Sequence, residues 1–400
     1  MRIYDASSEE ALRARKLLGD WAGEGFLTKE QYQRLVRDTV SELRTTNIFL
    51  RLILFVFTLI SVGATAALFV VVFLARPSSQ TIGIFLLIVA AICYAAAEAA
   101  VSQARLYRYG IEEALAVCSV VLLCVGMQFA LFSGSPYSPE SLHWLVPAAG
   151  AVFSFWIWRR FGLWYAFLVA LLFTASLPRY WTSSHSAQHA IVALLYAIGL
   201  LWVTAVRSRH RFDYLDGEFS LLEALLWLGI YLVINLQLSS LDLRGQWWGG
   251  TRAAFEFARP FYWSTWVLIW ALPPVILARG VRQKDRFVMA VGAIVAILTF
   301  VSNKPYLGWL RQPWDPMLLG ILLAGTALFI QRWLAHGPGG IRYGFTAARL
   351  SGKGKYWVNA VSPVLGLVTP QAITPSPQTS TPDFRFGEGA SGGGGAGGDF

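Results

Sequence analysis

Hydrophobic residues occur along this chain in long runs that are separated by short charged loops. The first run extends from Leu52 to Leu74 without an ionisable residue, and Arg51 and Arg76 flank it. This length is close to the ~20 residues that a helix needs to cross the hydrocarbon core of a bilayer. Leu, Ile, Phe and Val dominate the run, and insertion at the bilayer centre is favourable for each of them. The run therefore predicts a transmembrane helix.

Further apolar runs follow the first one. They lie at 81–101, 111–132, 142–158, 163–178, 187–206, 219–238, 260–278, 287–302 and 317–333. The pattern predicts an all-α fold, a polytopic transmembrane helical bundle of about ten spans. The runs at 142–158, 163–178 and 287–302 are short, so each is compatible with a full crossing or with a re-entrant or broken segment.

Composition supports the membrane class. Of the 400 residues, 56% are hydrophobic and 14% are charged, whereas an average soluble domain is about 25% charged. A net charge of +10 would favour nucleic-acid binding in a soluble protein. Here the basic residues flank the apolar runs, where they face anionic lipid headgroups. We therefore expect the lipid bilayer as a partner and no nucleic acid.

Lysine and arginine are distributed unevenly between alternate loops. The loops on the side of the N-terminus carry Arg105, Arg108, Arg159, Arg160, Arg207, Arg209, Arg211, Arg279, Arg282, Lys284 and Arg286. The intervening loops carry fewer basic residues, and only the loop at 239–259 is mildly basic. By the positive-inside rule this asymmetry predicts that both termini are cytoplasmic. No cleavable signal peptide is evident, because mostly polar residues precede the first run.

Two soluble helices are expected before the first span. Ser7 or Ser8 is a candidate N-cap for the first helix. Thr28 followed by Gln31 predicts a capping box for the second. A helical hairpin of this size buries too little surface to be stable alone. It therefore leans on the membrane domain, on lipid headgroups or on a second copy of itself.

The hairpin also carries a recognisable spacing, formed by Leu17, Leu18, Trp21, Gly25, Phe26, Leu27, Thr28, Gln31, Tyr32 and Leu35. This pattern, followed directly by a span, resembles the opening of a bacterial family of predicted membrane proteins of unknown function. The resemblance implies a short cytoplasmic helix pair, a string of transmembrane helices and a multi-pass location in the bacterial inner (plasma) membrane. It brings no catalytic residues. The motif is also similar to short oligomerisation hairpins beside bacterial membrane segments, which implies a homo-oligomer or a protein partner at the hairpin.

Polar side chains inside the runs are the natural candidates for function, because burying them in a membrane is costly. The candidate intramembrane polar site comprises Glu98, Gln128, Asn235 and Gln237. The three amides are compatible with a shared outward-facing cavity or with hydrogen bonds between helices. Glu98 is compatible with a proton or cation ligand, or with an ion pair to Arg105 or another loop arginine.

Other polar residues have structural interpretations. Glu112 and Glu113 begin the third run, where carboxylates complement the helix dipole. Ser220 and Glu223 predict a capping box at the start of the seventh.

Small residues and prolines indicate how the spans pack. Gly63 and Ala67 in the first span have a spacing that permits close helix contact, as do Ala91, Ala95 and Ala99 in the second. Pro273 and Pro274 are expected to break or kink the eighth span. Broken helices often border transporter sites.

The chain offers little for metal or cofactor chemistry. The weak metal candidates are His143, His185 and His189. The i,i+4 spacing of His185 and His189 suits a metal, but no Cys or carboxylate accompanies them at fixed spacing. The cysteines, Cys93, Cys118 and Cys124, lie inside apolar runs and are expected to be packing residues. Catalytic and phosphate-binding motifs do not occur before the tail, so we expect no metal, cofactor or catalytic residue.

These observations divide the chain into four parts. They are a cytoplasmic helical hairpin (1–46), a transmembrane helical domain (47–334), a basic juxtamembrane segment (335–368) and a disordered tail rich in Pro/Thr/Ser and then Gly (369–400). The span count, the kinked span and the intramembrane amides favour a transporter or permease-like protein for a small solute. One alternative is a non-catalytic membrane scaffold or sensor that acts through its cytoplasmic hairpin and tail. Another is a membrane-embedded enzyme that acts on a lipid-linked substrate.

Overall fold

The structure, a computed structural model, describes ten stretches of the chain. They are residues 2–23, 25–39, 43–73, 78–132, 142–210, 215–239, 257–309, 312–337, 341–342 and 345–346. By their contacts, Met1–Leu328 form one compact unit and Phe329–Phe400 a second. The expected disordered tail at 369–400 lies outside the described residues, as does most of the expected basic segment at 335–368.

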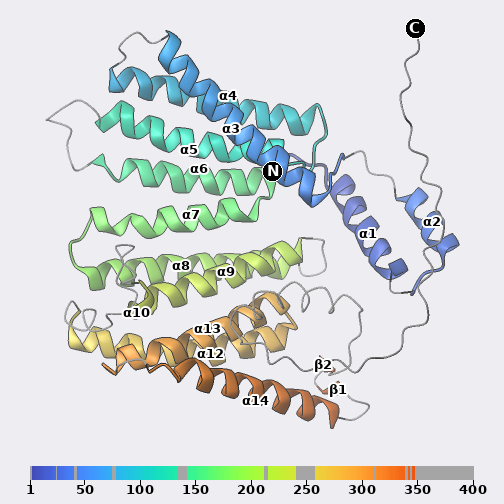
Figure 1. The fold of residues 1–400 in the computed structure, drawn as a ribbon, viewed down its shortest axis with the longest axis vertical. Helices are drawn as coiled ribbons and strands as arrows, with labels where there is room; N and C mark the ends of the chain where they lie inside the picture. The colour runs from blue at the N-terminus through green and yellow to red at the C-terminus, as the bar shows by residue number, and fades with distance from the viewer. Residues whose placement is uncertain are drawn as a thin grey trace, which may run out of the picture. The chain divides into compact units, whose positions relative to one another are not determined.

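The described chain is helical except for one pair of two-residue strands. In chain order the elements are α1 Ala6–Gly23, α2 Lys29–Asp38, α3 Ile48–Phe73, α4 Ser79–Ser102, α5 Ile111–Phe132, α6 Leu145–Phe161, α7 Trp164–Ser176, the 3₁₀ turn η2 Pro178–Tyr180, α8 His185–Arg209, α9 Asp216–Ile234, α10 Leu236–Ser239, α12 Arg259–Gln283, α13 Arg286–Tyr306, α14 Asp315–Ala335, β1 Ile341–Arg342 and β2 Phe345–Thr346 (Figure 1). The two strands pair antiparallel. The expected all-α class is therefore confirmed for the described residues.

Eight of the described helices are long and apolar enough to cross a membrane: α3, α4, α5, α8, α9, α12, α13 and α14. Helices α6 and α7 have 17 and 13 residues. At 1.5 Å per residue they measure about 25 and 20 Å, less than the ~30 Å of bilayer hydrocarbon. Each of the ten predicted runs contains a helix, and the run at 219–238 is divided between α9 and α10. Eight of the described helices meet the length criterion for a span, so the expected count of about ten is not confirmed. The short run at 287–302 belongs to the full-length helix α13.

Local signals decide where the two N-terminal helices begin. The capping box of α2 is confirmed, because the Gln31 backbone N–H donates to Thr28 Oγ1 at 3.2 Å and the Thr28 N–H donates to Gln31 Oε1 at 3.0 Å. The expected cap of α1 is wrong. Ser7 and Ser8 already lie inside the helix, and the Asp5 carboxylate accepts from the Ser8 N–H at 3.1 Å.

Two apolar clusters hold the helices of the first unit together. The larger cluster contains residues of the six successive helices from α4 through α9 and of the N-terminal segment. Tyr4, Ile157 and Phe167 are among its buried members. The smaller cluster joins α9, α12 and α13 around Tyr231 and Ile269. Consecutive helices such as α4 and α5, α6 and α7, and α12 and α13 lie side by side (Figure 1). Among the described residues, α14 has no buried side chain and α3 has only Ala66, as expected for surfaces that lipid solvates.

The small residues pack on a different face from the one expected. Gly63 and Ala67 are exposed, and a Cβ added at Gly63 would meet nothing within 4 Å. Ala91 and Ala95 of α4 are also exposed. The buried face of α4 carries Gly83, Ala90, Cys93, Ala97 and Val101. Helices α4 and α5 meet along this face, whereas Ala91 and Ala95 are not part of it and Ala99 is only partly buried. The face that meets α5 is therefore offset from the predicted one by part of a helical turn.

The helix interruption also lies elsewhere than expected. Helix α12 continues through Pro273 and Pro274, so these residues do not break it. The interruption is at Asn235, between α9 and α10, where ψ is 91°.

Candidate functional site

A network of neutral polar side chains surrounds the interruption between α9 and α10. We call it the Asn235 network; it contains Tyr231, Asn235, Gln237, Tyr262, Thr265, Thr299, Ser302 and Tyr306. Asn235 Nδ2 donates to the Tyr231 hydroxyl at 2.9 Å and to Ser302 Oγ at 2.8 Å. Tyr231 is in turn 2.9 Å from Thr299 Oγ1. These four side chains are buried, so α9, the interruption at Asn235 and α13 share hydrogen bonds that water does not reach.

Tyrosines in the network satisfy backbone groups that the interruption frees. The Leu236 N–H donates to the Tyr306 hydroxyl at 2.7 Å, and this hydroxyl is 3.4 Å from the Ile234 carbonyl oxygen. Tyr262 donates to the carbonyl oxygen of Tyr306 at 3.0 Å and accepts from Gln237 Nε2 at 3.0 Å. A helix end within a membrane needs such partners, because hydrocarbon supplies none. The network therefore supplies hydrogen-bond partners to backbone groups that the interruption would otherwise leave unpaired in the membrane.

One acceptor of the network has no partner among the described residues. Asn235 Oδ1 is fully buried and accepts no hydrogen bond. An unsatisfied buried polar group costs roughly 1–3 kcal/mol. This oxygen is accordingly the point at which the network could bind a further donor.

The structure brings two of the four candidate intramembrane residues together. Asn235 and Gln237 belong to the Asn235 network. Glu98 accepts from Arg160 Nε at 2.7 Å and from the Tyr94 hydroxyl at 3.2 Å, which agrees with the expected ion pair to an arginine, although Arg160 in the last turn of α6 takes the place of Arg105. Gln128 is exposed on α5. Two hollows that the structure contains, described below, are lined by none of the four.

Two of the histidine candidates are engaged with neighbouring groups. His189 Nδ1 is 2.7 Å from the carbonyl oxygen of Val233. The ring of Phe257 lies 5.6 Å from the His189 ring and 6.4 Å from the His185 ring. His143 precedes α6 and is partly exposed. Among the described residues, no group of three His, Cys, Asp or Glu side chains is placed to hold a metal ion.

Charged residues gather at the opposite end of the helices. We call this the hairpin end: it is the end at which α4, α6, α8 and α12 finish and α5, α7, α9 and α13 begin. Arg207 is a hub there, because it donates to Glu223 at 2.8 Å, to Asp216 at 2.9 Å and to Asp285 at 2.6 Å. Arg279 also pairs with Glu223. Helices α8, α9 and α12 and the N-cap residue of α13 are thus joined by ion pairs around the carboxylate of Glu223, which is completely buried.

Sequence reasoning missed this hub. The expected Ser220–Glu223 capping box is wrong, because α9 begins at Asp216 and Ser220 lies inside it. Ser220 Oγ instead donates to Asp285 Oδ2 at 2.6 Å. Glu112 and Glu113 do lie in the first turn of α5 as expected, and Glu113 also pairs with Arg51 of α3. An available signal was the basic last turn of α8, with Arg207 and Arg209, followed by the acidic first turn of α9, with Asp216 and Glu218.

A second ionic cluster fastens the N-terminal segment to the hairpin end. We call it the N-terminal latch; it consists of Arg2, Glu9, Arg13, Tyr107 and Glu218. Arg2 and Arg13 each pair with both Glu9 and Glu218. The Tyr107 hydroxyl donates to buried Glu9 at 3.0 Å. Burial raises the pKa of Tyr107, so this hydroxyl stays a donor throughout the physiological range.

Backbone and apolar contacts complete the attachment. The Ile3 N–H donates to the Arg160 carbonyl oxygen at 3.0 Å. The Tyr4 ring is buried and meets the Tyr107 ring edge-on at 4.9 Å. The N-terminal residues and the start of α1 are therefore attached to the hairpin end of the bundle.

Replacing Glu218 by glutamine should loosen the N-terminal latch. Glu218 accepts charged hydrogen bonds from Arg2 and Arg13, and such bonds contribute roughly 1.5–3 kcal/mol. We expect amide hydrogens of α1 to exchange at least about tenfold faster in Glu218→Gln. Exchange monitored by mass spectrometry on the full chain measures this. Glu10→Gln changes an exposed carboxylate of the same helix and should leave exchange unchanged; equal rates in the two variants would contradict the role of the latch.

Asp285 should make the stability of the hub depend on pH. Burial alone would raise its pKa, but the Ser220 hydrogen bond and the Arg207 charge outweigh burial and hold the pKa below the ordinary 3.8. The stabilisation is therefore complete above about pH 4 and is lost as the pH falls through the folded-state value. We expect Asp285→Asn to lower the free energy of unfolding by about 2 kcal/mol at neutral pH, and the difference from the unaltered chain to shrink below about pH 4. Unfolding titrations in detergent at several pH values test this, and a difference that grows on acidification would refute it.

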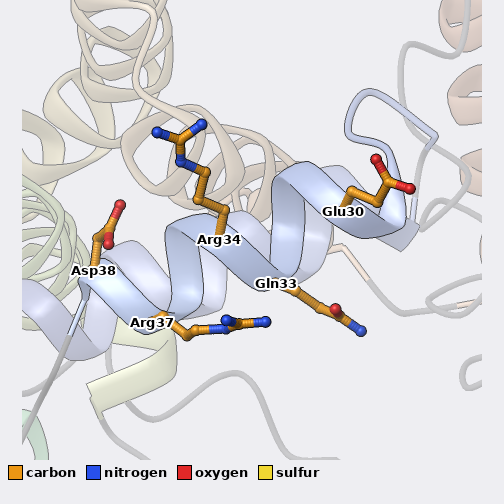
Figure 2. Close-up of a pocket in the computed structure, with 5 residues that line it drawn as sticks. All are labelled: Glu30, Gln33, Arg34, Arg37 and Asp38. Carbon is orange, nitrogen blue, oxygen red and sulfur yellow. The ribbon is translucent and has the colours of Figure 1, made fainter.

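The second helix of the hairpin carries a charged, solvent-exposed stripe. Figure 2 shows Glu30, Gln33, Arg34, Arg37 and Asp38 projecting from α2, where they line a shallow hollow. All five are exposed. Their spacing follows the helical repeat, so the stripe is one solvent-exposed face of α2.

Apolar side chains on the same hairpin are also exposed. They are Leu17 and Trp21 of α1, Phe26 of the connecting turn and Leu35 of α2. Phe26 is 67% exposed. Several exposed aromatic and aliphatic residues on one small module are typical of a contact surface.

Comparison of the chain with models of protein families, with curated proteins and with solved structures finds no match. The resemblance of the N-terminal motif to a bacterial membrane-protein family therefore stays a prediction. The membrane class depends on the eight long apolar helices.

Proposed function

We propose that this multi-pass membrane protein is a non-catalytic scaffold or sensor that acts through its N-terminal hairpin. The observation that carries the proposal is the N-terminal latch. It joins α1 to the loop before α5 and to the start of α9, while apolar side chains of the hairpin remain exposed. A rearrangement of these helices would consequently move the exposed surface.

The proposed orientation places the hairpin end in the cytoplasm of a bacterial cell. Arg108, Arg160, Arg207 and Arg279 all lie at this end, and basic residues concentrate on the cytoplasmic side of membrane proteins. The partner is a second copy of the chain or another protein that meets the apolar side chains of the hairpin.

Photo-cross-linking in intact cells tests the proposal. A photoreactive phenylalanine analogue at Phe26 of the full-length chain is expected to give one discrete adduct, whose mass distinguishes a second copy from another protein. Leu17→Ser should reduce this adduct, because it removes neighbouring apolar surface. The analogue at exposed Glu10 serves as the matched control. Absence of a discrete adduct at Phe26, or an equal adduct at Glu10, would refute the proposal.

A second candidate function is permeation of a small neutral solute past the Asn235 network. The interruption between α9 and α10 supports it, together with buried Asn235 Oδ1, which has no partner among the described residues, since broken helices in transporters border substrate sites. The network is built from hydroxyls and amides without a charge, which suits polyols and other neutral hydrogen-bonding solutes. Swelling of proteoliposomes in glycerol and in larger polyols should be faster than in empty vesicles and should slow in Asn235→Leu. Equal swelling with and without protein would exclude this function.

A further inference from the structure

An apolar groove lies between α6, α7 and α8 of the bundle. It has a volume of about 340 Å³, and its lining includes Ala151, Phe155, Ala170, Thr174, Leu195 and Trp202. On α7 the lining extends from Phe167 to Thr174 and on α8 from Leu195 to Trp202. Each stretch covers about 10 Å along its helix axis. The groove therefore runs parallel to the helices, as an acyl chain of the bilayer does.

Apart from the indole N–H of Trp202, the groove offers no free hydrogen-bonding group to an occupant. Its two hydroxyl-bearing residues are already engaged with the backbone: Thr174 Oγ1 donates to the Ala170 carbonyl at 2.8 Å, and the Tyr196 hydroxyl donates to the Leu171 carbonyl at 2.5 Å. The remaining lining is apolar apart from the indole of Trp202. Since α8 is one of the eight candidate spans, the groove lies at the depth of lipid tails and selects a hydrocarbon chain.

Two arginines stand at the hairpin end of this groove. Phe155 of α6 and Trp202 of α8 are in contact, with ring centroids 5.9 Å apart. Arg159 follows Phe155 by one turn on the same face of α6, about 6 Å along the axis, and Arg209 follows Trp202 by two turns on α8, about 10 Å along the axis. Both arginines are exposed. They therefore flank the hairpin end of the groove at the height expected for lipid headgroups.

The arginines nearest to Arg159 and Arg209 in sequence are engaged in ion pairs. Arg160 is held by Glu98, and Arg207 is held by Asp216, Glu223 and Asp285. Neither Arg159 nor Arg209 pairs with a carboxylate among the described residues. Arg160 and Arg207 are thus neutralised by carboxylates of the bundle. Arg159 and Arg209, close to them in sequence, keep an uncompensated positive charge at the end of the groove.

We propose that the groove binds one anionic phospholipid. Its acyl chain lies between α6, α7 and α8, and Arg159 and Arg209 bind its phosphate headgroup. Shape and apolar lining select the chain, and the two guanidinium groups bind the phosphate through charge-assisted hydrogen bonds. They favour an anionic lipid because its headgroup has no positive group, such as choline, that offsets the phosphate charge and repels the arginines. This binding does not depend on either proposed function.

Native mass spectrometry of the full chain in detergent tests the proposal, with phosphatidylglycerol and phosphatidylcholine of identical acyl chains as probes. At roughly fivefold per arginine near an anionic headgroup, we expect phosphatidylglycerol to bind roughly 25-fold more tightly. The double variant R159Q/R209Q should remove the preference, whereas R282Q, at an exposed arginine that ends α12, should keep it. Equal affinities in the unaltered chain, or a preference that survives R159Q/R209Q, would overturn the proposal.

Variants that fill the groove distinguish lipid binding in the groove from lipid binding elsewhere on the lipid-facing surface. Ala151→Leu should weaken binding of both phospholipids, and Ala205→Leu, at an exposed position of α8 outside the groove, should weaken neither. Val152→Phe changes a rim residue that is 72% exposed and replaces Ala151→Leu if that variant does not fold. Unchanged binding in a folded variant with a filled groove would show that the lipid binds elsewhere and would overturn the assignment.

Discussion

Glu223→Gln is expected to lower the free energy of unfolding by about 3 kcal/mol. The Glu223 side chain is completely buried and pairs with Arg207 and Arg279. Removing one partner from a buried ion pair is strongly destabilising, because the remaining charge stays buried without compensation. Glutamine preserves the shape of the side chain, so the loss reports the charge and not the packing. Unfolding of the purified protein by titration with a denaturing detergent measures the difference.

A matched control is available on the same arginine. Asp216 also pairs with Arg207, but its side chain is 34% exposed. Exposed ion pairs contribute about 0–1 kcal/mol, so Asp216→Asn should have less than a third of the effect of Glu223→Gln. Losses of equal size in the two variants would contradict the view that burial makes Glu223 the centre of the hub.

Predictions from the sequence succeeded where the deciding interaction is local. The apolar runs predicted the helices because hydrophobic length alone determines whether a helix suits a bilayer. The capping box of Thr28 and Gln31 formed because both partners lie within one helical turn. Ser220 and Glu223 have the same spacing, but Asp285 and Arg279 bind them instead. Those partners are more than fifty residues away, and no local pattern identifies them.

The candidate site was predictable in part for the same reason. Asn235 and Gln237 share one network because they lie two residues apart at a helix interruption. Their partners Ser302 and Tyr262 come from other helices, so the sequence identified polar residues without their contacts. Glu98 meets Arg160 only because α4 and α6 are brought together in the fold.

The packing of small residues shows a third limit of prediction from the sequence. The small-xxx-small spacing of Ala91, Ala95 and Ala99 predicted a face of α4 suited to close contact, but α5 packs against another face. Several such faces coexist in this alanine-rich helix, and the sequence does not say which one meets α5. The buried one contains Gly83 and Ala97, whereas Ala91 and Ala95 remain exposed.

Gly83→Ala is expected to have the second large effect on stability. A Cβ built on Gly83 would lie 2.3 Å from the backbone nitrogen of Ala130 and 2.6 Å from its Cα. The obstructing atoms belong to the backbone of α5, so no side-chain rotation relieves the clash and the two helices have to separate. Overpacking typically costs about 1–3 kcal/mol, and we expect a loss of about 3 kcal/mol because backbone is involved. The same detergent titration measures it.

Gly63→Ala provides the contrasting case within the membrane domain. Gly63 lies in the middle of α3, where an added Cβ meets nothing within 4 Å. Alanine has a higher helix propensity than glycine by about 1 kcal/mol, so this variant should be neutral or slightly more stable. Because both substitutions add the same methyl group, the difference between them isolates the contact of α4 with α5. A Gly83→Ala protein as stable as Gly63→Ala would mean that the two helices do not approach as closely as this structure has them.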